Sequence, residues 1–225
     1  MVPKAILVAW SGGKDCLMAL ERLLADPQWR VTGLLTTMDR AADRVAMHDV
    51  PVDLVRAQAA ALGLPLTEMA IDWPAPNEAY ESALAAALAH ARADCADLRH
   101  VAFGDLFLAD LRTWREDSLS RLGWQGVFPL WHRPTRELAE SFIGHGHRAL
   151  VTTVDLEQLD GSFCGRDYDS EFLADLPASV DPCGENGEFH TFCHASPLFS
   201  RPLKLEIGLS RTKSERFRCM DLRLL

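Results

Sequence analysis

The residue types best suited to chemistry gather first near the beginning of the chain, in the stretch Ser11-Gly12-Gly13-Lys14-Asp15-Cys16. An apolar run, residues 5–9, precedes this stretch and is typical of a short buried strand. After it, Leu17, Leu20 and Leu24 are spaced to share one face of a helix. The glycines allow the backbone to approach a ligand closely, and the N–H groups at a helix N-terminus attract anions. We therefore predict a phosphate-binding loop, the alternative being a plain strand-to-helix turn.

The predicted loop is not a Walker loop. Lys14 is followed by Asp15 rather than by Ser or Thr, and Val8 stands where that motif needs its first glycine. Met38 and the pair Gly104-Asp105 end two later predicted strands, where ligands bind in parallel sheets. Asp15 and Asp105 are candidates to bind Mg²⁺ or to orient the loop. The predicted nucleotide-binding residues are Ser11, Gly12, Gly13, Lys14, Asp15, Cys16, Met38, Gly104 and Asp105.

A second group of chemically capable residues lies far along the chain, in residues 183–191. If a strand begins at Glu188, then Glu188 and His190 lie on one face, and Phe189 and Thr191 on the other. A carboxylate beside an imidazole can move a proton or orient an attacking amine. A solvated strand face is the alternative, and the residue types alone leave both open. The predicted catalytic residues are Glu185, Glu188, His190 and Thr191.

The elements that must position these residues alternate along the first half of the chain. Strands are predicted over residues 5–9, 31–38, 64–71 and 99–104, with helices between them and a fourth helix ending near residue 122. Asn77 and Thr135 are candidate helix N-caps, whereas Leu111, Trp114 and Leu122 are expected to face the core. The pattern predicts an α/β fold, a Rossmann-like parallel sheet with flanking helices.

The pattern changes near Gly123, and later segments are less regular. A strand is predicted over residues 149–154, and half-exposed strands over residues 203–207 and 220–224. We therefore predict two domains, a nucleotide-binding domain at residues 1–123 and a smaller α+β domain at residues 124–225 that receives the substrate.

Composition limits the classes of protein that the chain can be. Its net charge of -9 argues against nucleic-acid binding, which depends on neutralising phosphates. No apolar run approaches the roughly 18 residues that span a bilayer, and none reads as a signal peptide, so we expect a cytoplasmic protein without membrane contact. The six cysteines include no Cys-x-x-Cys pair and are expected to be reduced thiols.

The first stretch resembles the pyrophosphate loop, Ser-Gly-Gly-x-Asp-Ser, of the ATP pyrophosphatases in the adenine nucleotide alpha hydrolase superfamily. Cys16 replaces the final serine of that pattern, and a thiol is a weaker hydrogen-bond donor than a hydroxyl. Together with the second motif, the loop resembles the diphthine–ammonia ligase family over nearly the whole chain. The matching segments are Gly184-Glu185-Asn186-Gly187-Glu188-Phe189-His190-Thr191, Gly104-Asp105-Leu106, residues 111–116, residues 129–131 and residues 196–199.

This resemblance implies an ATP-dependent ligase that forms an amide. ATP and Mg²⁺ would be its cofactors, and a carboxylate would be adenylated with release of pyrophosphate before ammonia or an amine displaces AMP. The loop would hold the leaving phosphates, while Glu185, Glu188 and His190 would position the acceptor or guide the amine. Family members in archaea and eukaryotes amidate diphthine on elongation factor 2. The Arg- and Ala-rich composition indicates a bacterial source, where the acceptor must differ, for example a corrinoid precursor.

Two other functions stay open at this point, a tRNA-modifying ATP pyrophosphatase and a nucleotide-binding regulator without turnover. Net acidity argues against the first, and Cys16 is the main feature in favour of the second. A homodimer is also possible. We further expect burial to keep the Cys16 thiol neutral, and residues 184–191 to fold over the mouth of the ATP site in a cleft between the domains.

Overall fold

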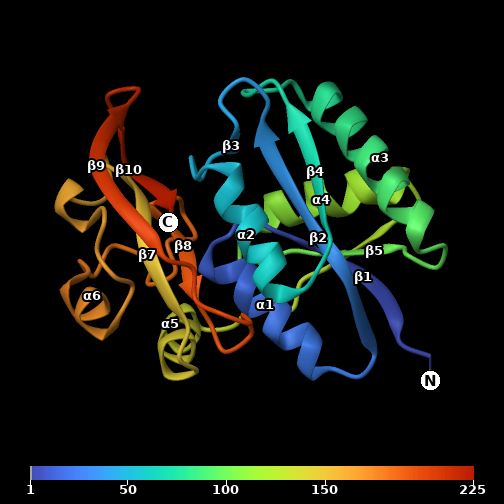
Figure 1. Ribbon diagram of the computed structural model, residues 1–225, viewed down its shortest axis with the longest axis horizontal. Coiled ribbons are helices and arrows are strands. Elements are labelled where there is room, and N and C mark those ends of the chain that lie inside the picture. Colours follow the sequence, from blue (N-terminus) through green and yellow to red (C-terminus); the bar gives the residue numbers. More distant parts are fainter. Residues whose placement is uncertain (1) are drawn as a thin grey trace.

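A computed structural model describes residues 2–225 and places them in two β-sheets with helices between and around them (Figure 1). The elements of the first half are β1 (Lys4–Ala9), α1 (Lys14–Ala25), β2 (Trp29–Asp39), β3 (Arg44–Val45), α2 (Val52–Leu62), β4 (Leu66–Ile71), α3 (Asn77–Asp94), β5 (His100–Ala102), α4 (Ala109–Arg121) and β6 (Gln125–Val127). Those of the second half are α5 (Thr135–Gly144), β7 (Arg148–Asp155), the 3-10 helix Gly161–Phe163, α6 (Ser170–Asp175), β8 (Phe189–Ala195), β9 (Leu205–Lys213) and β10 (Phe217–Leu224).

The first sheet is parallel apart from the short strand β3. Strand β1 lies between β2 and β5, β4 pairs with residues 34–39 in the second half of β2, and β6 pairs with β5. After β1 the chain first adds β2 and β4 on one side of that strand. It then crosses to the other side of β1, where it adds β5 and β6. The chain therefore changes direction between β1 and β5, and ligands of open α/β sheets bind at such a switch point, beyond the carboxyl ends of the strands.

Helices cover both faces of this sheet. Along β1, Ile6 and Val8 point into the core shared with α1 and α2, whereas Ala5 and Leu7 point into a separate core beneath α3 and α4. A strand buried on both faces has no polar alternation, which is why this segment reads as one apolar run. The predicted α/β fold class is thereby confirmed.

The second sheet is antiparallel, in the order β8-β7-β10-β9, and α5 and α6 pack with it. Figure 1 shows α1 and α2 between the two sheets. The buried residues of α1, of α2 and of the inner face of the second sheet form one continuous apolar cluster, which includes Leu17, Leu54 and Phe192. The second half thus packs on the helix that follows the glycine loop, while the division into domains at residue 123 stays a prediction.

Several local expectations are wrong in detail. Helices α2, α3 and α5 each begin directly after a proline, at Pro51, Pro76 and Pro134, so Asn77 and Thr135 are first helical residues rather than caps. A proline has its φ angle fixed near −65° and therefore ends an extended segment where a helix can start. The short strand β3, Arg44–Val45, lies where no strand was predicted.

In α4 the buried residues are Ser118 and Leu119, whereas Leu111, Trp114 and Leu122 are only half-buried. The hydroxyl of Ser118 tolerates burial because it reaches Glu81 at 3.3 Å.

Within residues 2–225, every helix is too short or too polar to cross a lipid bilayer.

Candidate active site

The glycine loop lies directly after β1, beside the switch point of the sheet. Gly12 has a φ of 85°, and a Cβ atom there would lie 2.9 Å from Oε1 of Gln58, so both the conformation and the space require glycine. Gln58, on α2, donates to the carbonyl of Gly12 at 2.9 Å and accepts from the indole of Trp10 at 2.8 Å. Gln58 therefore positions the loop. Sequence reasoning missed this role, although a glutamine on the apolar face of a helix was a signal.

The second motif forms hydrogen bonds with the backbone at the N-terminus of α1. Gly13 is the N-cap and has no side chain, so the backbone N–H of Lys14 donates instead to Oγ1 of Thr191 at 3.1 Å. Two residues farther along β8, the N–H of Cys193 donates to the carbonyl of Gly12 at 2.9 Å. The predicted meeting of the two motifs is confirmed by these bonds, and Thr191 acts on the loop directly. A cleft between the domains stays a prediction.

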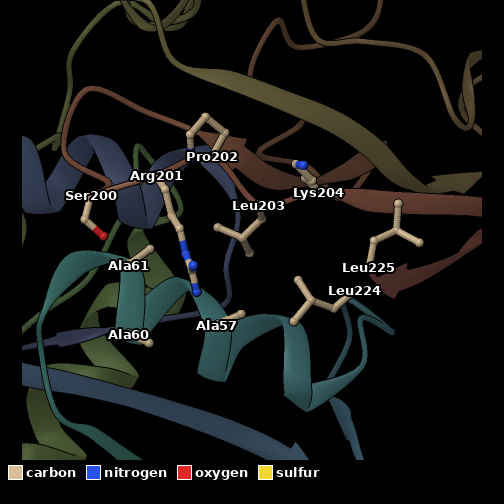
Figure 2. Close-up of a pocket in the computed structure, with 10 residues that line it drawn as sticks. All are labelled: Ala57, Ala60, Ala61, Ser200, Arg201, Pro202, Leu203, Lys204, Leu224 and Leu225. Carbon is tan, nitrogen blue, oxygen red and sulfur yellow. The ribbon is translucent and has the colours of Figure 1, made fainter.

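The cavity drawn in Figure 2 lies elsewhere, between the second half of α2 and the segment before β9. It is lined by residues such as Ala57, Ala61, Arg201 and Leu203, none of which belongs to the two motifs.

Lys14 is buried and joins the two motifs through its side chain. Its ammonium contacts the carboxylate of Asp15 at 2.9 Å and donates to the carbonyl of Cys183, and it lies over the rings of Tyr168 and Phe189 at 5.6 and 5.4 Å. Burial alone would lower the pKa of Lys14, but the charge and hydrogen bond of Asp15, with the acidic groups of Cys183 and Glu185, together outweigh it and raise that pKa. The lysine is therefore a permanent cation at this junction.

Glu185 comes from the second motif and reaches the segment that follows β5. Its Oε1 accepts hydrogen bonds from the N–H groups of Leu106, at 2.7 Å, and Phe107, at 3.3 Å. Burial raises the pKa of Glu185 to about 7, with the charges of Asp15 and Asp105 adding to the effect and the two N–H groups opposing it. A carboxylate that exchanges its proton near neutral pH suits general acid–base chemistry.

The side chain of Glu188 forms hydrogen bonds within the loop that precedes β8. Its Oε1 accepts from the N–H of Asp181 at 2.9 Å and from the amide of Asn186 at 3.0 Å, whereas its buried Oε2 has no hydrogen-bond partner among residues 2–225. The predicted catalytic role of Glu188 stays a prediction, and it would depend on that second oxygen.

His190 lies against His48, a residue to which the sequence analysis gave no role. Its ring lies at 35° to that of His48 with 4.4 Å between centroids, and a Cβ atom on Gly13 would lie 3.5 Å from Cε1 of His48. Burial lowers the pKa of His190 to about 4, aided by the charge of Lys14, so the ring is neutral at pH 7. His48 is thus a further candidate, and its position just beyond a predicted strand end was the available signal.

Cys16 lies in the first turn of α1, where its thiol donates to the carbonyl of Gly13 at 3.0 Å. Burial raises the pKa of Cys16 to about 11, so the thiol is neutral at pH 7, as predicted. Its hydrogen bond replaces the one that a serine hydroxyl would make at this position.

The remaining predicted residues occupy different surroundings. Met38 is buried within β2, where it pairs with Val45 and Ala70. Asp105 accepts from Arg115 at 2.7 and 3.4 Å, so both of its oxygens are engaged. Asp15, in contrast, has a buried Oδ1 without a hydrogen-bond partner in the described part of the chain. Asp15 therefore fits a role as a Mg²⁺ ligand better than Asp105, whose charge is already paired with Arg115.

Replacing Gly104 with alanine is expected to destabilise the protein by about 1–3 kcal/mol, the usual cost of overpacking. A Cβ atom at this position would lie 2.8 Å from the backbone carbon of Asp15, and the backbone cannot yield as a side chain can. Urea denaturation measures the effect. The matched control is Gly144→Ala in α5, where the added methyl meets nothing within 4 Å. Equal stability of the Gly104 variant and the wild type would show that the loop is not held against β5.

Known families account for both halves of this arrangement. The family model described as diphthamide synthase N-terminal domain matches residues 4–125, and the one described as diphthamide synthase C-terminal domain matches residues 134–219. The chain belongs to the diphthamide synthase family. Both motifs of the site lie inside the matched ranges, one in each, and the resemblance seen in the motifs is thereby confirmed.

Two individual proteins also resemble this member of the diphthamide synthase family. The diphthine–ammonia ligase of Schizosaccharomyces pombe (strain 972 / ATCC 24843) is 27% identical over 113 residues, which are 48% of this chain and 19% of that protein. The chain therefore aligns with about a fifth of this relative. A predicted subunit of tRNA methyltransferase from Methanocaldococcus jannaschii has a solved structure that covers 86% of this chain and 98% of its own, at 16% identity and a TM-score of 0.42.

Proposed function

We propose that the chain is an ATP-dependent ligase that adenylates a carboxylate, releases pyrophosphate, and then forms an amide with release of AMP. The observation that carries the proposal is the direct bonding of the second motif to the N-terminus of α1, between Thr191 and Lys14. Membership of the diphthamide synthase family supports the same reaction class. We further propose that residues 1–123 bind ATP and residues 124–225 receive the acceptor.

The phosphates of ATP would lie against the loop from Ser11 to Cys16. The loop supplies backbone N–H groups at a helix N-terminus, whose partial positive charge favours phosphate. The ammonium of Lys14 adds a positive charge, although it contacts Asp15 in the structure and would reach phosphate only through a change in that pair. Magnesium, held by Asp15 together with phosphate oxygens, would neutralise charge on the leaving pyrophosphate.

In the proposed reaction, an oxygen of the acceptor carboxylate attacks the α-phosphorus, and the bond to the bridging oxygen of pyrophosphate breaks. Ammonia then attacks the acyl carbon, and AMP leaves with the electron pair of the broken C–O bond. The nitrogen must lose a proton in this step, and Glu185, with its pKa near 7, is the proposed base. The neighbouring rings of His48 and His190, both half-buried, would cover one side of the acyl-adenylate and limit its hydrolysis by water.

The acceptor is proposed by class only, as a carboxylate on a protein side chain or on a small molecule. Diphthine is the acceptor named for the Schizosaccharomyces pombe relative, and a corrinoid precursor is the alternative for a bacterial chain. A regulator that binds ATP without turnover is the second candidate function. The observation that favours it is the engagement of Lys14 by Asp15 and Cys183 instead of by solvent.

Isotope exchange between pyrophosphate and ATP tests the proposal. In the presence of a carboxylate acceptor and without ammonia, we expect labelled pyrophosphate to enter ATP, because adenylation is reversible. Adding ammonia should then convert the exchange into net formation of AMP and amide. Tight ATP binding without exchange in the presence of diphthine-bearing elongation factor 2 or carboxylated corrinoids would favour the regulator.

A further inference from the structure

A cluster of two histidines and a glutamate lies outside the site described above, where the two halves of the chain meet. Glu21 is on α1, two turns beyond the glycine loop, whereas His145 and His147 flank Gly146 in the turn between α5 and β7. One ligand atom from each of the three residues can be chosen so that all lie within 4.8 Å of one another. Figure 1 shows α1 and α5 as neighbours across the junction.

The turn between α5 and β7 places the rings of His145 and His147 next to the carboxylate of Glu21. Gly146 has a φ of 82°, a left-handed conformation that reverses the chain between the histidines. As a result, Nδ1 of His145 lies 3.0 Å from Oε2 of Glu21, and Nε2 of His147 lies 3.2 Å from Oε1. Ligands around a tetrahedral zinc ion, at about 2.0–2.1 Å from the metal, are separated by about 3.3 Å. Each ring nitrogen thus lies close to that distance from one of the two oxygens of the same carboxylate.

The other nitrogen of each ring meets a serine hydroxyl. Nε2 of His145 lies 3.5 Å from Oγ of Ser141, and Nδ1 of His147 lies 3.0 Å from Oγ of Ser196. A histidine that binds a metal through one nitrogen usually donates from the other to an oxygen, which sets the ring orientation. In each of these two imidazoles, one nitrogen lies next to the carboxylate of Glu21 and the other lies next to a serine hydroxyl.

Burial differs across the cluster in a way that leaves one side open. The side chain of His147 is fully buried, that of Glu21 is 29% exposed and that of His145 is 53% exposed. A metal with these three ligands would therefore have its fourth position toward solvent, where water can complete the coordination.

We propose that Glu21, His145 and His147 form a zinc site that ties α1 to the turn between α5 and β7. Two imidazoles and one carboxylate suit zinc better than magnesium or calcium, which prefer oxygen ligands. The helix that carries Glu21 also carries the glycine loop, so bound zinc would hold that loop against the second half of the chain. The alternative is a hydrogen-bonded cluster in which the glutamate accepts from both rings.

Calorimetry with Zn²⁺ on the chelator-treated full chain, kept reduced by a non-chelating phosphine, tests the proposal. We expect one equivalent of zinc to bind, and His145→Ala to weaken the affinity more than about 100-fold, beyond the loss typical of outer partners. His145 is half exposed, so its loss should leave the fold intact. The matched control is His90→Ala, which removes an exposed histidine from α3 and should bind zinc like the wild type.

Co²⁺ in place of zinc identifies the ligands, because the chain also has free cysteines. The wild type and His90→Ala are expected to show the visible absorption of tetrahedral Co²⁺ and no thiolate charge-transfer band. The His145→Ala variant is expected to show no such visible absorption. Zinc should also raise the melting temperature of the first two proteins but not of the third. The proposal is overturned if the wild type binds no zinc, if His145→Ala binds it equally well, or if the cobalt spectrum shows thiolate ligands.

Discussion

The Lys14→Met variant is expected to release pyrophosphate about 10²–10³-fold more slowly than the wild type, as enzymes do when they lose a group that stabilises developing charge. Lys14 is the buried cation at the junction of the two motifs, and methionine keeps most of its length without its charge. The same variant should lose about 3 kcal/mol of stability, because Asp15 is left without its partner. Exchange of labelled pyrophosphate into ATP gives the rate, and urea denaturation gives the stability.

The double variant Lys14→Met with Asp15→Asn separates the two effects. Removing the carboxylate as well relieves the unpaired charge, so most of the lost stability should return, while the exchange rate should stay low. If the rate returns together with the stability, Lys14 has only a structural role. A single variant that keeps the wild-type rate would also remove Lys14 from the proposed chemistry.

The Glu185→Gln variant is expected to form amide about 10²-fold more slowly at pH 8 while binding ATP as the wild type does. Glutamine can still accept from the N–H groups of Leu106 and Phe107, so the loop should keep its position. A base must be ionised, and the pKa of Glu185 is about 7, so the wild-type rate should rise with pH through that value. The variant should lack that rise, and the rate ratio of the two proteins cancels the ionisation of ammonia itself.

The matched control for this prediction is Glu171→Gln, which changes an exposed glutamate at the start of α6. It should show the wild-type rate and the wild-type pH profile. A ratio of wild type to Glu185→Gln that does not change between pH 6 and pH 8 would exclude Glu185 as the base. A ratio that falls as pH rises would indicate an acid instead.

The sequence by itself determined the features that depend on local pattern. The apolar run of β1, the glycines after it and the leucines of α1 predict a strand, a turn and a helix, because each depends on neighbours a few residues away. Alternation of such units also predicts the parallel sheet, since right-handed crossovers leave few other arrangements. Residue types in both motifs were enough to indicate the family.

Only the tertiary structure decided which groups meet across long stretches of chain. Thr191 completes the N-terminus of α1 from 177 positions away, and Glu185 reaches the N–H of Leu106 from 79 positions away. Such partners have no periodic signal, because their contact depends on how the second sheet packs against α1. The same packing buries Lys14 against Cys183 and brings His48 onto His190. Burial and neighbouring charge set the protonation of these groups, and both exist only once the chain is folded.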